Sequence, residues 1–100
     1  MSIYSEVNAF LTPANWAKNA SNMEGRSCIL GARAYVKYGG YLKTYDEDEF
    51  SHKVAGIVRE QFPERYIVGN SVFSTYHFND HKETTLDDIR LVLEKADADE

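Results

Sequence analysis

The pentapeptide HFNDH, at positions 77–81, holds the densest group of side chains in the sequence that could bind a metal ion or move a proton. Imidazole and carboxylate groups are common ligands of zinc and other transition metals. On a continuous helix, His77, Asp80 and His81 would share one face, because residues three and four positions apart are neighbours there. These three residues are therefore the candidate metal ligands of the chain.

The middle of the same stretch is also typical of a turn. Asn79 and Asp80 favour turns and caps over helix interiors, because their short polar side chains bind nearby backbone groups. We interpret them as a turn toward the Thr84 or Thr85 cap of the last helix, with Phe78 in the core. On a turn the polar side chains do not converge, so we expect no metal ion and no other cofactor.

Cys28, the only cysteine in the chain, is the candidate nucleophile. With His77 and Asp80 it could form a Cys-His-Asp arrangement, since such groups are recognised by geometry rather than by sequence order. Arg26 and a predicted helix start lie beside it, and both favour a thiolate. The alternative is a buried cysteine on an apolar helix face. The sequence contains no glycine-rich phosphate loop and no nucleophile elbow.

Aromatic side chains form the second group of candidates. Six of the seven tyrosines lie at positions 35–76, which is more than a small core can easily bury with every hydroxyl bonded. Tyr and Trp are enriched at the hot spots of interfaces. In one interpretation they form a protein-binding surface, and in the other they lie at the edge of the core. The residues proposed for such a surface are Tyr38, Tyr41, Tyr45, Phe73 and Tyr76.

The overall composition excludes several classes of function. One hundred residues with 43% hydrophobic and 13% aromatic content predict one folded domain over 1–100, with a frayed acidic tail over about 97–100. A net charge of −5 without basic clusters disfavours direct nucleic-acid binding. No stretch approaches the roughly 20 apolar residues of a membrane span. We expect a cytoplasmic protein that does not bind membranes.

The elements that must position these residues are mostly helices. Ser2 is a good cap for a short amphipathic first helix. Thr12 and Pro13 predict the start of a second helix over residues 13–22. A third helix, over residues 26–38, is apolar around more than half of its circumference and is the expected central helix.

The second half of the chain contains two further predicted helices. Acidic residues at positions 46–49 favour the start of a fourth helix, which Pro63 ends. The last helix follows Thr84 or Thr85 and runs to Ala96. Residues 66–78 between them predict a small β-hairpin around a Gly-Asn turn, or alternatively a loop with a short helical turn. The predicted fold is thus mainly α, a compact bundle of four to five short helices with the hairpin near 66–78 as an optional addition.

Several short motifs follow one another along residues 15–96. They comprise a Trp, a Gly-x-x-Cys-x-x-Gly-Ala run, an Asn-Asp step and a Thr before the last helix, and their main residues are Trp16, Cys28, Ala32, Asn79, Asp80 and Thr85. This order resembles a family of small uncharacterised proteins of actinobacteria and bacteriophages. The resemblance implies a compact, mostly helical domain of unknown function, with a bacteriophage gene as one source. His77 and His81 lie outside the pattern.

Together these features favour a non-enzymatic protein-binding module. If the chain is encoded by a phage, we expect an accessory protein that binds and modulates a host protein in the host cytoplasm. A homodimer is compatible with the same exposed aromatic residues. The alternative is a small-ligand-binding protein or small hydrolase with a pocket near Cys28, His77, Asn79 and Asp80.

Overall fold

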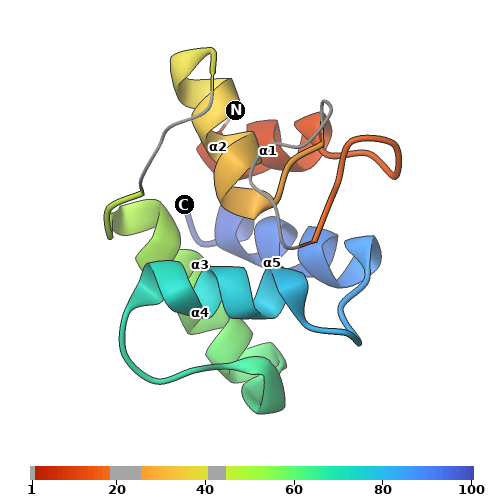
Figure 1. Ribbon diagram of the computed structural model, residues 1–100. Coiled ribbons are helices and arrows are strands. Elements are labelled where there is room, and N and C mark those ends of the chain that lie inside the picture. The colour runs from red at the N-terminus through yellow and green to blue at the C-terminus, as the bar shows by residue number, and fades with distance from the viewer. Residues whose placement is uncertain (1, 19–25, 41–44) are drawn as a thin grey trace.

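The computed structural model describes residues 2–18, 26–40 and 45–100. In these ranges the chain forms five α-helices and one short 3₁₀ helix (Figure 1), and an isolated bridge pairs Trp16 with Ser27. The mainly α prediction is therefore confirmed. Within the same ranges, no helix has the length and apolar character needed to cross a membrane. The helices are α1 (Ile3–Phe10), α2 (Ile29–Tyr38), α3 (Glu49–Gln61), η1 (Pro63–Arg65), α4 (Ser71–Asp80) and α5 (Leu86–Ala98).

One hydrophobic core joins the five α-helices. α5 packs against α1 and α3, and α4 packs against α3 and α2. Figure 1 shows α4 crossing the front of the molecule, with α3 and α5 behind it. The rings of Tyr4 and Phe50 stack with their centroids 5.1 Å apart and join α1 to α3. The fully buried aliphatic side chains of the core include Val7, Ile29, Val54, Val58, Ile89, Val92 and Leu93.

Several helix ends agree with the sequence analysis. The Ser2 hydroxyl accepts a hydrogen bond from the Ser5 amide and caps α1. Thr85 caps α5 in a capping box with Asp88, and α3 ends two residues before Pro63. α5 continues to Ala98, two residues beyond Ala96, and the Ser2 hydroxyl donates to the Asp97 carboxylate in the segment predicted to fray.

The helix predicted for residues 13–22 is wrong for its described part, residues 13–18. The Asn15 side chain accepts from the Thr12 amide and donates to the Phe10 carbonyl, so it takes backbone groups that a continuing helix would use. The chain then turns, and Trp16 forms its bridge to Ser27. Residues 19–22 lie outside the described ranges.

The predicted β-hairpin at residues 66–78 is also wrong, because α4 occupies residues 71–80. The Asn70 side chain accepts from the amides of Val72 and Phe73, at 2.8 and 3.2 Å. Gly69 has a φ of +122°, a backbone conformation that favours glycine. The Gly-Asn pair is therefore a helix cap rather than a hairpin turn.

Asn79 and Asp80 do not form the predicted turn. They are the last two residues of α4, and His81 is its C-cap. The turn comes later, where the Thr84 amide donates to the His81 carbonyl at 3.0 Å. Asn79 tolerates the helix because its side chain binds distant partners rather than the neighbouring backbone. The prediction that Phe78 lies in the core is confirmed, since its side chain is fully buried.

Candidate functional site

α4 lacks the single core-facing apolar stripe of an ordinary amphipathic helix, although it buries Val72 and Phe78. Most of its buried positions are polar, whereas Phe73 on its outward side is 68% exposed. Amphipathic helices normally turn their apolar stripe to the core. α4 therefore leaves apolar surface on the outside of the molecule. Its buried polar residues are Ser71, Ser74, Thr75 and Asn79.

Hydrogen bonds satisfy the buried hydroxyl groups of α4. Ser74 donates to the carbonyls of Ile67 and Asn70, and Thr75 donates to the Ser71 carbonyl at 2.8 Å. The Ser71 and Ser51 hydroxyls lie 2.9 Å apart and join α4 to α3. Buried hydroxyls are tolerated when they are bonded in this way. The polar side of α4 can therefore face the core without a large desolvation cost.

Asn79 is the centre of a buried polar network. Its side-chain oxygen accepts from the Trp16 indole nitrogen at 2.9 Å and from the Ile29 amide at 3.3 Å. Its side-chain nitrogen donates to the Ala17 carbonyl at 3.0 Å and to Asp80 at 2.9 Å. One amide group thus joins α4 to the start of α2 and to the segment around Trp16. Trp16 and Asn79 of the sequence motif therefore contact each other, and their hydrogen bond has a structural role.

Cys28 is the N-cap of α2 and is buried. Its sulfur accepts a hydrogen bond from the Gly31 amide at 3.3 Å. Burial raises the pKa of the thiol, and the nearby Asp80 carboxylate adds to the rise. A raised pKa favours the thiol over the reactive thiolate. Ala32, the neighbouring motif residue, is also fully buried in the core.

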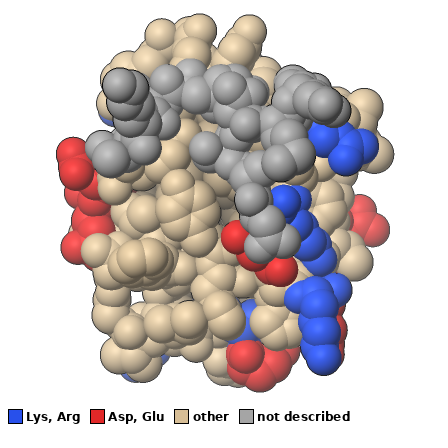
Figure 2. Space-filling view, in the orientation of Figure 1, with Lys and Arg blue, Asp and Glu red and all other residues tan. Residues whose placement is uncertain are grey.

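The outward side of α4 and the loop before it enclose a groove, which we call the α4 groove, with a volume of about 460 Å³. Val68 on the loop is 86% exposed and Ile67 is 42% exposed. Figure 2 shows a largely uncharged face over α4 with a hollow at the lower left, where this loop passes. The groove is lined by Ile67, Val68, Asn70, Phe73, Tyr76, His77, Asp80 and His81.

His77 and His81 lie together at one end of the α4 groove. Their rings meet edge to face with centroids 5.9 Å apart. Nδ1 of His81 accepts from the Glu83 amide at 3.1 Å, so the neutral ring carries its proton on Nε2 and presents a donor. Within the described ranges, no group of three or more His, Cys, Asp or Glu side chains is arranged to hold a metal ion.

The aromatic residues proposed for a binding surface separate into two places. Phe73 and Tyr76 line the α4 groove, and the Tyr45 ring meets Tyr76 edge to face at 6.2 Å. Burial raises the pKa of Tyr76, so its hydroxyl stays protonated. Tyr38 is exposed at the end of α2, where the Lys37 ammonium lies 5.3 Å from its ring centroid. Tyr41 lies outside the described residues.

Sequence reasoning missed the part that the loop contributes to the α4 groove. Ile67 and Val68 were assigned to a hairpin strand, and Asn70 to its turn. The signal that could have identified them is Asn70 directly before Ser71, since Asn is among the best N-cap residues. Reading it as a cap would have placed the two apolar residues on a loop beside a helix.

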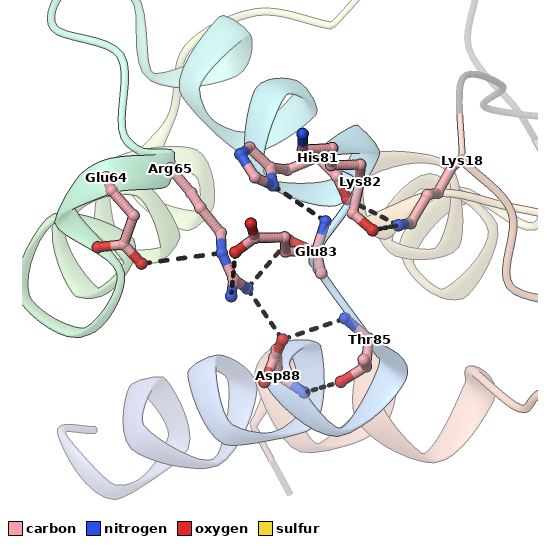
Figure 3. A network of polar contacts seen from close by, with 9 residues as sticks. Lys18, Glu64, Arg65, His81, Lys82, Glu83, Thr85 and Asp88 are labelled. Atoms are coloured by element: carbon pink, nitrogen blue, oxygen red, sulfur yellow. Dashed lines mark hydrogen bonds and ion pairs between the residues drawn. The ribbon is translucent and has the colours of Figure 1, made fainter.

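A second polar network connects η1 to the start of α5 (Figure 3). Nη1 of Arg65 donates to Asp88 at 2.9 Å, and other guanidinium nitrogens lie 3.8 Å from Glu83 and 3.9 Å from Glu64. The guanidinium carbon lies 4.8 Å from the centre of the Phe62 ring. Because Arg65 is committed to neighbouring acidic groups, we assign this network a structural role.

Lys18 binds backbone carbonyl groups that follow the C-terminus of α4. Its ammonium donates to the His81 carbonyl at 2.6 Å and to the Lys82 carbonyl at 3.4 Å (Figure 3). Cations are favourable at helix C-termini, where carbonyl groups lack helical partners. This contact holds the chain in place at His81, at the end of the α4 groove where the two histidines lie.

A second cavity, of about 450 Å³, lies among α1, α2 and α3. Arg33 lines it and forms an ion pair of 2.5 Å with Asp48. Its guanidinium carbon also lies 5.4 Å from the Phe50 ring centre. These contacts attach α2 to the start of α3. The Arg33 guanidinium that lines this cavity therefore has a structural role.

The comparisons with known proteins assign the family but no activity. No curated protein and no solved structure matches the chain. The family model DUF6197 matches residues 2–99, which include all five α-helices and every residue that lines the α4 groove. The chain therefore belongs to DUF6197, a family of unknown function.

Proposed function

We propose that the protein is a non-enzymatic binding module whose α4 groove receives part of another protein. The apolar surface that α4 and the preceding loop leave exposed supports this proposal. Of the six large hydrophobic side chains that are exposed among the described residues, three line this one groove: Ile67, Val68 and Phe73. Single exposed apolar residues are common, whereas a group of them in one hollow is typical of an interaction site.

The alternative proposal is a small-ligand-binding protein or small hydrolase. Its support is the volume of the α4 groove, which falls within the roughly 300–1,000 Å³ of small-molecule sites. The hydrolase form needs an activated nucleophile, yet burial raises the pKa of Cys28 and its sulfur does not line the groove. The exposed apolar wall gives the protein-binding proposal the stronger support. For a phage-encoded chain, the proposed partner is a host protein in the cytoplasm.

Site-specific photo-crosslinking in the native cell tests the proposal. A photoreactive residue at Val68, on the wall of the α4 groove, should trap a protein partner. The matched control carries the same residue at Leu91 of α5, which is 38% exposed and does not line the groove. A partner trapped at Val68 and absent at Leu91 supports the groove. Equal trapping at both sites, or none at Val68, contradicts it.

A pair of substitutions then tests whether the apolar wall carries the binding. Phe73→Ser should remove most of the trapped partner, because it deletes the most exposed aromatic side chain of the α4 groove. Leu91→Ser is the matched control and should leave trapping unchanged. Circular dichroism of both purified variants verifies that each is folded. Trapping that survives Phe73→Ser would favour another surface.

A further inference from the structure

The α4 groove changes character along the helix, and the inference drawn from this change rests on the proposed binding role. Ile67, Val68 and Phe73 form an apolar end. The imidazoles of His77 and His81 and the Asp80 carboxylate form a polar end. Phe73 and Asp80 are seven residues apart on α4, which corresponds to about 10 Å along the helix axis.

The polar end of the α4 groove favours a cation. Among the lining residues that the structure describes, Asp80 is the only one with a full charge when the imidazoles are neutral. Its carboxylate accepts from the Asn79 side chain at 2.9 Å and lines the groove. The chain carries a net charge of −5, which also attracts positively charged partners.

We propose that the groove binds an amphipathic helix of a partner protein. A large aliphatic residue of this helix lies between Val68 and Phe73, and a Lys or Arg seven positions away lies beside Asp80. Residues seven apart on a helix share one face and are separated by about 10 Å, which matches the spacing on α4. An extended segment covers that distance in about three residues, which places the two side chains on opposite faces.

Capped alanine-based helical peptides can test this chemistry directly. The first peptide has Leu at its fourth and eighth positions and Lys at its eleventh. The second has Glu in place of the Lys, and the third has Ala in place of both Leu residues. Titration of the full chain with each peptide is followed by changes in its backbone amide NMR shifts. The first peptide should shift the amides of Val68, Phe73 and Asp80.

The second and third peptides separate the two parts of the inference. The Glu peptide should bind about two- to fivefold more weakly than the Lys peptide, the range expected for a partly exposed ion pair. The Asp80→Asn variant should lose most of this preference for the Lys peptide. The third peptide should produce no saturable shifts. Equal affinity of the parent chain for the Lys and Glu peptides would overturn the cationic end of the proposal.

Other occupants of the α4 groove would produce different results. Concentration-dependent dimerisation that Phe73→Ser abolishes would replace the partner helix with a second copy of this chain. Crosslinking at Val68 without groove shifts for any peptide would overturn the helical partner while leaving the proposed binding function intact. Absence of both the Val68 crosslink and the amide shifts would contradict the proposed binding function as well as the helical partner.

Discussion

α4 and α5 belong to the same core but bury different proportions of polar and apolar side chains. α5 buries Ile89, Val92, Leu93 and Ala96 and leaves its charged residues exposed or half-buried. α4 buries Val72 and Phe78 together with hydroxyl groups and an amide, and it exposes Phe73. The comparison shows that α5 is attached mainly by apolar burial, whereas α4 adds a buried hydrogen-bond network to the apolar contacts of Val72 and Phe78. Only the second arrangement leaves apolar surface available for a partner.

The largest expected effect is in α5. Leu93→Ala should lower the free energy of unfolding by about 3 kcal/mol, because it removes buried methyl groups and leaves a cavity. Urea denaturation followed by circular dichroism measures the loss. Leu91→Ala on the same helix is the matched control and should change stability by less than about 0.5 kcal/mol, since Leu91 is partly exposed. Similar losses at both positions would contradict the burial assigned to α5.

The next effect is in the polar network of α4. Asn79→Ala should cost about 2 kcal/mol, because the Trp16 indole, the Ile29 amide and the Ala17 carbonyl each lose a partner. Urea denaturation gives the free energy, and the emission of Trp16, the only tryptophan, reports on its environment. A loss below about 0.5 kcal/mol would show that hydrogen bonds do not attach α4.

A smaller effect concerns acid stability at the start of α5. Burial opposes charge on Asp88, but hydrogen bonds from Arg65 and the Thr85 amide outweigh it and hold its pKa below the ordinary value. The unfolded chain therefore binds this proton more readily than the native state does. The stability that Asp88 contributes is present above about pH 4 and is lost as the pH falls through the native pKa.

Urea denaturation between pH 7 and pH 3 measures this contribution. Asp88→Asn should lower stability at pH 7 and flatten the decline toward pH 3. Asp87→Asn, at the exposed neighbouring position, is the matched control and should retain the parent slope. If the unfolding free energies of the parent and the Asp88 variant fall in parallel with pH, the Arg65–Asp88 contact does not stabilise the start of α5.

The same comparison explains which parts of the fold could be predicted from the sequence. α5 was predicted because its apolar residues repeat at helical spacing after a strong cap. α4 was misread because most of its buried positions are polar and its apolar positions do not form a stripe. Its helical state depends on partners distant in sequence, such as Ser51 and Trp16, and no local pattern contains these partners.

The candidate site was predicted in part for the same reason. Phe73 and Tyr76 were selected by residue type, and both line the α4 groove. The metal and turn interpretations of residues 77–81 both failed to foresee that Asn79 binds Trp16 and Ile29 inside the protein. Val68 was missed because only the arrangement of loop and helix places it beside Phe73.

The unfolding free energy of the Phe73→Ser variant tests the central claim most directly, namely that Phe73 of α4 faces outward and does not serve the fold. Ser and Phe have similar helix propensities, so the substitution mainly reports the burial of the ring. The account predicts a stability within about 0.5 kcal/mol of the parent chain. A loss of about 2 kcal/mol or more would show that Phe73 belongs to the core and would contradict the α4 groove.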